Sequence, residues 1–484
     1  MSTVIESTPE NVPVDLHRNF VSKLLSGAAS LSASQVARRV FRALFLLLAA
    51  RLLGPEVFGL YVLIFTVMEL LALISGAGFG DYLTREVAKS PNSAYRLLFQ
   101  ITQLRLVYLM LLAAIVIPGL SLLKYSPYVV RNAALLSVTL VPRAIAESSQ
   151  GIIRAMHRFS LIFWIELLQG IVLLGTGGLL LIRGWGLRGV IWADIASIVL
   201  GALVALPIAL RLAPSRTKNV TGWKQTISDT FAFNLYPVIG STYDHVDVVI
   251  LSKLVGNAAL GIYSLPYRAY AALSILPSGI MGTLLPSLAK SNWGQDERRR
   301  CNMTMQLLYA SSLFLILGAM LLADIAVQAV LGPGYRESAG VLKILVWATI
   351  PMFFNYALNT ILLAKNQERV FLRTASVCTL VNVTANLLLI PLYSYYAAAG
   401  VTILTEMVLL GQNLVLVRRS LGYIPVPRLA LRNSLVFALT LVAAYGTARF
   451  LPIVAVATLA LGLFSIYLYV TNRVFLHPGR AYAA

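Results

Sequence analysis

The sequence predicts an all-α integral membrane protein of about 14 transmembrane helices, arranged as two parallel six-helix lobes with two appended helices. Three observations lead to this fold class: an apolar composition, apolar runs long enough to cross a bilayer, and sequence echoes that recur six predicted spans later. Of the 484 residues, 58% are hydrophobic and only 12% are charged. Soluble domains carry about 25% charged residues, so the composition excludes an ordinary soluble chain.

Apolar runs broken by Pro, Gly and charge clusters define the candidate spans, because a helix needs about 20 apolar residues to cross a bilayer. The expected limits are 32–52, 57–80, 93–118, 127–152, 159–182, 188–210, 227–254, 258–285, 299–322, 338–363, 368–391, 396–417, 428–449 and 452–473. Residues 1–31 are polar and contain no short apolar core of the kind found in cleaved signal peptides. We expect them to form a cytoplasmic tail that is disordered or interfacial.

The distribution of Lys and Arg predicts the orientation. With the N-terminus in the cytoplasm, the inner ends and loops hold roughly three times as many basic residues as the outer ones, a strong positive-inside bias. An even number of spans then places both termini in the cytoplasm, and we expect a multi-pass protein of the inner membrane. Topology and attraction to anionic membrane lipids account for most of the net charge of +20. We therefore expect no nucleic-acid partner.

Two echoes indicate an internal duplication. ARLLGPEVFGLY at 50–61 returns as SKLVGNAALGIY at 252–263, and RAMHRFS at 154–160 is matched by KNQERVF at 365–371. Both echoes are displaced by six predicted spans, an even number, so the two halves share one membrane orientation. The expected organisation is a tail (1–31), an N-lobe (32–211), a cytoplasmic linker (212–226), a C-lobe (227–419), and two further spans with a short cytoplasmic tail (420–484).

Three segments carry a resemblance to a known family: SQVARRVFRALFLLLAARLLGPEVFGLY (34–61), GIIRAMHRFS (151–160) and ILLAKNQERVFL (361–372). The chain resembles, over nearly its whole length, the polysaccharide transporter family, which includes the O-antigen-type lipid-linked oligosaccharide flippases. That family belongs to the multidrug/oligosaccharidyl-lipid/polysaccharide exporter superfamily. The resemblance implies alternating-access movement of a polyprenyl-(pyro)phosphate-linked glycan to the outer leaflet for surface polysaccharide biosynthesis. It also implies contact with polysaccharide polymerase and glycosyltransferase machinery.

One departure bears on the substrate. Lipid II flippases of the same superfamily usually carry an Arg-Asp pair in the first helix. Here Arg38, Arg39 and Arg42 have no adjacent acid, which argues against a peptidoglycan precursor.

Arginines within the spans are the candidate substrate-binding residues, because charges inside a membrane are costly and usually face a cavity. Guanidinium groups also suit phosphate oxygens. Arg268 lies deep in its span and is the best single candidate, while snorkelling to the interface is an alternative for the arginines of the first span. Tyr263, Tyr267 and Tyr270 could stack on sugars or simply pack. The expected cationic set is Arg38, Arg42, Arg105, Arg143 and Arg268.

Acids and one histidine are the candidate ion-coupling or gating residues. STYDHVD (241–247) contains Asp244, His245 and Asp247, and a carboxyl beside a histidine could exchange protons during transport. An inter-lobe salt bridge to an arginine is the alternative. Glu147 is added to this set, although it is spaced to pair with Arg143 one turn away, which favours a structural ion pair.

Missing motifs narrow the function further. The sequence has no P-loop and no paired Cys or His spacing, so we expect no cofactor, no metal site and no catalytic residue. Two alternatives remain beside the flippase. A membrane enzyme of envelope assembly would need larger extramembrane loops, and a multidrug or organic-cation antiporter would need an acid-lined cavity. A central cavity lined by Arg42 and Arg268, with Asp244 close by, would favour the flippase.

Overall fold

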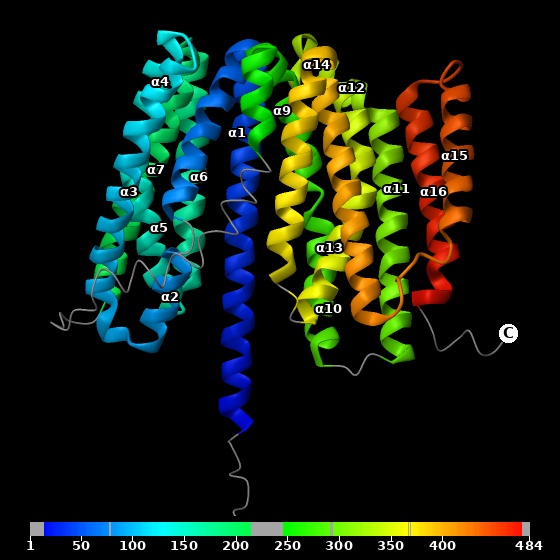
Figure 1. Ribbon diagram of the computed structural model, residues 1–484, viewed down its shortest axis with the longest axis horizontal. Coiled ribbons are helices and arrows are strands. Elements are labelled where there is room, and N and C mark those ends of the chain that lie inside the picture. The colour runs from blue at the N-terminus through cyan, green and yellow to red at the C-terminus, as the bar shows by residue number, and fades with distance from the viewer. Residues whose placement is uncertain are drawn as a thin grey trace, which may run out of the picture. The chain divides into compact units, whose positions relative to one another are not determined.

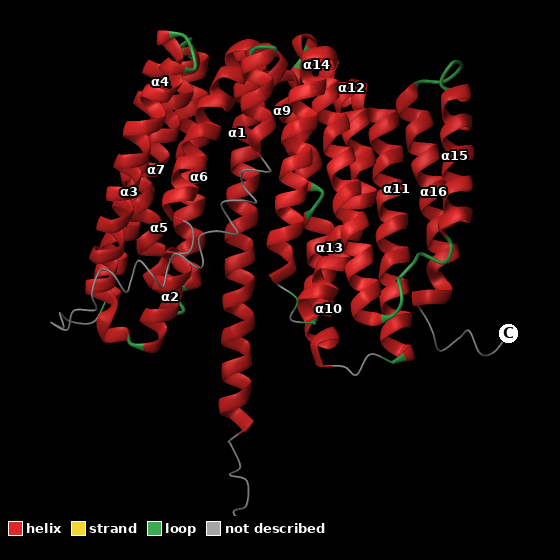
Figure 2. Cartoon of the chain, in the orientation of Figure 1, coloured by secondary structure: helices red, strands yellow, loops and turns green. Residues whose placement is uncertain are grey.

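The computed structural model describes residues 14–76, 79–213, 245–290, 294–365, 367 and 369–476. Every regular element in this part of the chain is helical, as Figure 2 shows, which confirms the predicted all-α class. Residues 245–254 are helical. The other helices are α1 (Val14–Gly76), α2 (Phe79–Lys89), α3 (Ala94–Leu122), α4 (Pro127–Ser137), α5 (Leu140–Ala155), α6 (Phe159–Ile182), α7 (Gly186–Leu212), α9 (Asn257–Ala272), α10 (Ile275–Lys290), α11 (Gln295–Leu331), α12 (Arg336–Leu345), α13 (Thr349–Ala364), α14 (Arg369–Leu421), α15 (Ala430–Thr447) and α16 (Ile453–Leu476), with 3₁₀ turns η1 (Pro91–Ser93), η2 (Pro333–Tyr335) and η3 (Val346–Ala348).

The chain is a multi-pass membrane protein. Among the described residues, 10 helical stretches are long and apolar enough to cross a membrane. Two of them, Ala33–Lys89 and Val370–Leu421, each contain two of the predicted spans. The predicted span 258–285 corresponds to the shorter helices α9 and α10, and most of 227–254 lies outside the described residues. The total of 14 spans therefore stays a prediction.

Backbone breaks inside α1 and α14 separate the two predicted spans that each of these long helices contains. Gly54 interrupts α1 with φ 73° and ψ 169°, a conformation that favours glycine. Pro55 follows, and the residue before a proline avoids the α region. Ser394 breaks α14 in the same way, with φ 56° and ψ −139°. The C-terminal turn of α14 contacts the segment that precedes the helix, because the Ser420 hydroxyl donates a hydrogen bond to Gln367 Oε1 (2.9 Å).

The described chain divides into two compact units. The first contains residues up to 46 and between 71 and 234, and the second contains residues 47–70 and those from 235 onward. The division differs from the predicted lobe of 32–211 by assigning 47–70 to the second unit. Local contacts explain this assignment: Tyr335 donates a hydrogen bond to the Ala50 carbonyl (3.1 Å), and Arg51 donates to the Ala329 carbonyl (3.1 Å). The lobe limits stay a prediction.

Each unit has its own apolar core. In the first, buried side chains of α2, α3, α5 and α7 pack together, including Leu83, Ile101 and Ile152. In the second, α11 packs against α15 and α16 around Ile316, Phe437 and Phe464, and Figure 1 shows these three helices side by side. The helices 428–449 and 452–473 predicted as appended are therefore part of the second unit's core.

The two copies of the echoed turn cross each other inside the second unit. A Cβ atom on Gly59 would lie 1.8 Å from the Asn257 carbonyl oxygen, and one on Gly261 would lie 2.0 Å from the Pro55 carbonyl oxygen. In the alignment of the echo, Asn257 corresponds to Pro55 and Gly261 to Gly59. The contact is thus reciprocal, as in a two-fold interface. Glycine at both positions allows the backbones of α1 and α9 to touch.

Candidate functional site

A cavity of about 380 Å³ lies within the second unit. It is lined by residues of α1, 245–254, α9, α13 and α14, so segments far apart in the sequence build it. Three of the predicted site residues, Arg268, His245 and Asp247, are among its lining residues. The others are Val62, Thr66, Val248, Tyr263, Ser264, Tyr267, Tyr270, Ala271, Ser274, Met352, Tyr356, Asn382, Thr402 and Glu406.

Helix α9 supplies an aromatic wall beside the cationic residue. The rings of Tyr263 and Tyr267 are stacked with centroids 5.5 Å apart, and Tyr267 and Tyr270 lie 6.1 Å apart at 50°. Steps of four and three place these side chains on one face of the helix, next to Arg268. The cavity therefore combines a guanidinium with aromatic rings, the two groups that the sequence singled out.

Asp247 is held by its neighbours. Its side chain is 5% exposed, and Oδ2 accepts a hydrogen bond from the Tyr263 hydroxyl at 2.7 Å. Oδ1 accepts one from the Val248 amide at 2.8 Å. The Tyr263 hydroxyl also lies 3.4 Å from Thr402 Oγ1. His245 lines the same cavity, whereas Asp244 lies outside the described residues.

Glu406 is a second cavity acid, which the predicted site did not include. Its carboxylate accepts hydrogen bonds from Asn355 Nδ2 (2.8 Å) and the Tyr270 hydroxyl (3.2 Å). Asn413 Nδ2 in turn donates to Asn355 Oδ1 (3.1 Å). A lone acid in an apolar span is the sequence signal that marks such a residue. The lining residues that the structure describes thus have mixed charge, with one arginine, one histidine and two carboxyl groups.

The first unit brings the remaining predicted residues into ion pairs. Glu147 of α5 joins two arginines: Arg105 of α3 donates to Oε2, and Arg143 donates to Oε1 at 2.9 Å. Arg105 is 2% exposed, and its Nε has no hydrogen-bond partner. The Glu147 side chain is 40% exposed. Two guanidinium groups therefore share one carboxylate, and the cluster keeps a net positive charge.

The first-span arginines pair with acids from other helices. Arg42 Nη1 lies 2.5 Å from Asp194 Oδ1, and the Asp194 side chain is 3% exposed. Arg38 Nε lies 4.0 Å from Glu166 Oε2, and Arg38 is 62% exposed. Arg42 has no acid next to it in the sequence, and Asp194 of α7 provides one in the structure. Because Arg42 belongs to the first unit and Arg268 to the second, the expected meeting of Arg42, Asp244 and Arg268 stays a prediction.

Metal binding has no obvious place in the described part of the chain. No group of three or more His, Cys, Asp or Glu side chains there could hold a metal ion. Cys301 and Cys378 are both buried as free thiols. What the clusters can do chemically is bind anions at the arginines and exchange protons or cations at the cavity carboxyl groups.

Comparisons with known proteins identify related sequences and folds. A family model described as "Polysaccharide biosynthesis protein" matches residues 24–292. No curated protein matches the chain significantly.

Solved structures with similar folds are membrane transporters. The lipid II flippase MurJ in an inward closed conformation is 14% identical, with a TM-score of 0.66 over 91% of this chain and 99% of MurJ. An inward-facing multidrug resistance MATE family transporter of the MOP superfamily is 15% identical, with a TM-score of 0.62 over 82% and 98%. A MOP superfamily transporter from Pyrococcus furiosus, described as having a binding pocket of reverse polarity, is 14% identical, with a TM-score of 0.56 over 82% and 95%.

Proposed function

The chain belongs to the polysaccharide biosynthesis protein family, whose model matches residues 24–292, and we propose that it is a flippase for lipid-linked oligosaccharides. Its substrate would be a polyprenyl-(pyro)phosphate-linked glycan, carried from the inner to the outer leaflet by alternating access. The observation that carries this proposal is the cavity of the second unit, where Arg268 lies beside stacked tyrosines.

The cavity residues suit the two parts of such a substrate. Arg268 offers a planar set of donors for phosphate oxygens, and the rings of Tyr267 and Tyr270 offer flat apolar faces for sugars. The volume of about 380 Å³ matches the lower part of the range for small-molecule pockets. The cavity would therefore hold the pyrophosphate and the first sugar rather than the whole glycan.

The cavity acids would couple transport to an ion gradient. Asp247 is buried, accepts a hydrogen bond from Tyr263 and shares the cavity with His245. Protonation of either group would change the charge that faces Arg268, which links substrate binding to proton binding. Asp244, directly before His245, belongs to the same proposal on sequence grounds.

The arginines of the first unit would contribute a second anion-binding site. Arg105 and Arg143 meet at Glu147, which makes Glu147 a gating residue in this proposal. Arg42 and Arg38 would extend the cationic set when Asp194 and Glu166 release them.

The proposed setting is the inner membrane, with both termini in the cytoplasm. A flippase of this kind would receive its substrate from glycosyltransferases and deliver it to a polysaccharide polymerase, so those proteins are the proposed partners. O-antigen or a similar surface polysaccharide is the proposed product of the pathway. No chemical step on the substrate is part of the proposal.

One observation favours a second candidate, a multidrug or organic-cation antiporter. Asp247 and Glu406 both line the cavity, and carboxylates attract cationic drugs. The two candidates differ in the role that they give to Arg268: a flippase needs the cation, and a cation exporter would be helped by its removal.

Arg268→Gln separates these candidates. Cells whose surface polysaccharide depends on this gene should lose most of their polymer with the variant, and Arg268→Lys should retain part of it because the charge remains. Arg336→Gln, an exposed arginine outside the cavity, is the control and should leave the polymer unchanged. Normal polymer with Arg268→Gln, together with increased efflux of a cationic dye, would favour the antiporter.

A further inference from the structure

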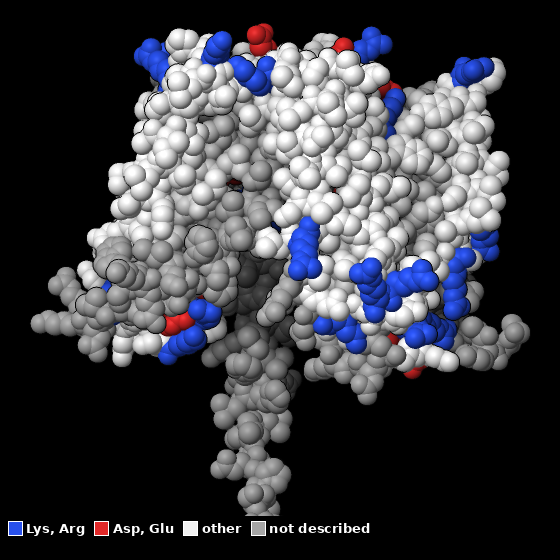
Figure 3. Space-filling view, viewed as in Figure 1, with Lys and Arg blue, Asp and Glu red and all other residues white. Residues whose placement is uncertain are grey.

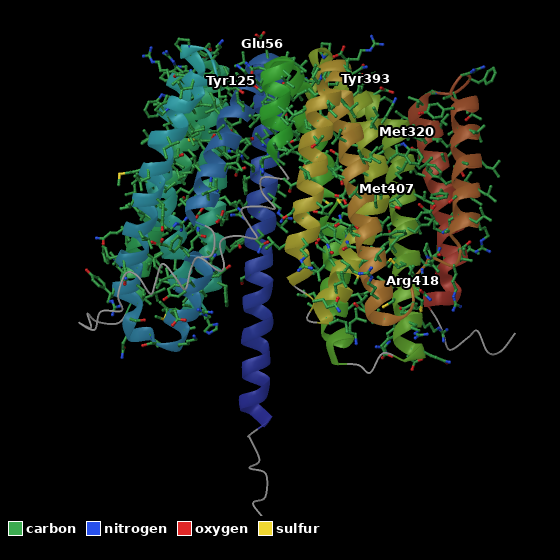
Figure 4. All side chains as sticks on the ribbon, viewed as in Figure 1. Glu56, Tyr125, Met320, Tyr393, Met407 and Arg418 are labelled. Atoms are coloured by element: carbon green, nitrogen blue, oxygen red, sulfur yellow. The ribbon has the colours of Figure 1, made fainter. Side chains whose placement is uncertain are left out.

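Exposed arginines gather at one end of the second unit. Figure 3 shows blue side chains along its lower edge, and Figure 4 labels Arg418 at this end and Glu56 at the opposite end. We call this set the arginine patch. It contains the exposed residues Arg298, Arg299 and Arg300 of α11, Arg418 and Arg419 of α14, Arg428 of the following loop and Arg432 of α15.

The loop that joins α14 to α15 is tied to α11. The Val426 amide donates a hydrogen bond to Asn302 Oδ1 (3.1 Å), and the Leu429 amide donates to Gln306 Oε1 (2.9 Å). The Arg298 guanidinium lies over the Tyr423 ring, 4.9 Å from its centroid. These contacts bring arginines from three elements together and limit the freedom of the loop.

The seven arginines of the patch outnumber the two acids that lie next to them in the sequence, Asp296 and Glu297. No Asp or Glu follows Glu406 to the end of the chain. Asp296 and Glu297 lie in the first turn of α11, but Glu297 Oε2 accepts a hydrogen bond from the Gly294 amide (3.1 Å). These two carboxylates offset only part of the charge of the seven arginines, so the patch keeps an excess of positive charge.

An apolar stripe continues from the patch along α15. Leu431, Leu435 and Leu439 are 76%, 57% and 70% exposed, and steps of four place them on one face of the helix. Arg428 lies two residues before α15 and Arg432 lies in its first turn, so both are close to the start of this stripe. A ligand that matches both features has an anionic head and an apolar chain.

We propose that the arginine patch binds the phosphate head group of an anionic phospholipid, whose acyl chains lie along the exposed leucines of α15. Arginine forms paired hydrogen bonds to phosphate oxygens, and basic pockets at the ends of membrane helices bind anionic lipid head groups. Each arginine near such a head group contributes roughly fivefold to affinity. This site is separate from the cavity and does not depend on the transported substrate.

The test compares two lipids on the purified full chain in detergent. Dioleoylphosphatidylglycerol and dioleoylphosphatidylcholine have the same acyl chains, so a difference in bound lipid by native mass spectrometry reports the head group. The variant is Arg428→Gln with Arg432→Gln. The control is Arg336→Gln with Arg449→Gln, which removes the same charge from two exposed arginines outside the patch.

We expect the patch variant to bind phosphatidylglycerol about 25-fold more weakly, since two arginines are removed. The control variant should bind as the unmodified chain does, and Arg428→Lys with Arg432→Lys should be intermediate because charge remains without the paired hydrogen bonds. Equal binding of the two lipids, equal losses in both double variants, or unchanged binding in the patch variant would each overturn the proposal. If the patch instead binds an acidic protein, the patch variant should bind phosphatidylglycerol as the unmodified chain does.

Discussion

The crossing of the two echoed turns gives a sharp prediction about stability. Gly59→Ala adds one methyl group where its carbon would lie 1.8 Å from the Asn257 carbonyl oxygen. That atom belongs to the backbone at the start of α9 and cannot turn away as a side chain could. The two helices must therefore separate by about 1 Å or more, which disturbs the surrounding close-packed side chains.

The expected cost follows from this clash. Overpacking in a tight core costs about 1–3 kcal/mol, whereas alanine in place of glycine inside a helix contributes about 1 kcal/mol in the other direction. Because the clash is with backbone atoms, we take the upper end of the overpacking range, about 3 kcal/mol, and subtract the opposing gain of about 1 kcal/mol. We therefore expect Gly59→Ala to destabilise the protein by about 2 kcal/mol, which lowers Tm by about 5 °C for a unit of this size. Gly261→Ala should behave alike, because its Cβ would lie 2.0 Å from the Pro55 carbonyl oxygen.

The assay is thermal unfolding of the purified protein in detergent. Gly411→Ala in α14 is the matched control, because a Cβ there meets no atom within 4 Å, and its Tm should stay equal or rise. If Gly59→Ala and Gly411→Ala unfold at the same temperature, the two backbones are not in contact and the crossing is wrong.

Three further predictions concern the charged clusters. Asp194→Asn leaves Arg42 without the carboxylate at 2.5 Å and should lower stability by about 3 kcal/mol; unfolding in denaturant measures this, and an unchanged midpoint would contradict it. Glu147→Gln removes the carboxylate shared by two guanidinium groups and should strengthen binding of inorganic pyrophosphate roughly tenfold; calorimetry that finds equal or weaker binding would show that Glu147 does not compete with anions. Asp247→Asn removes a buried carboxyl group of the cavity, so transport into vesicles should lose its dependence on a pH gradient; a retained dependence would exclude Asp247 from coupling.

The helical membrane fold could be predicted because bilayer crossing imposes a signal on the sequence itself. A span must be long and apolar. Gly54 and Pro55, which the sequence shows between two apolar runs, mark the break between two spans. Limits such as 159–182 coincide with α6, because a turn bounds each end. The pattern was less informative for 258–285, where α9 and α10 are separate helices.

The partners of the charges could not be predicted, because they depend on how helices pack. The sequence pairs Arg143 with Glu147 through their spacing of four, and this contact is present. The second partner, Arg105, comes from α3, and Asp194 reaches Arg42 from α7. No spacing rule links residues so far apart in the sequence.

Gly76 shows how such a packing constraint escapes sequence analysis. A Cβ there would lie 2.4 Å from Arg105 Nη2, so the glycine provides space for the guanidinium that binds Glu147. This glycine falls inside the expected span 57–80, and the sequence assigns it no packing role. Its role depends on a side chain of another helix.

The reciprocal crossing also explains how a duplicated element can acquire one site. The alignment that matches Gly59 with Gly261 also matches Val62 with Ser264 and Thr66 with Arg268. Both members of these last two pairs line the cavity. The duplication therefore directs equivalent positions of α1 and α9 toward one space. Only one copy carries a guanidinium. Because the backbone contact is symmetric and the lining chemistry is not, the described lining residues place a guanidinium on the α9 side and none on the α1 side, an asymmetry that can orient a ligand whose charge lies at one end.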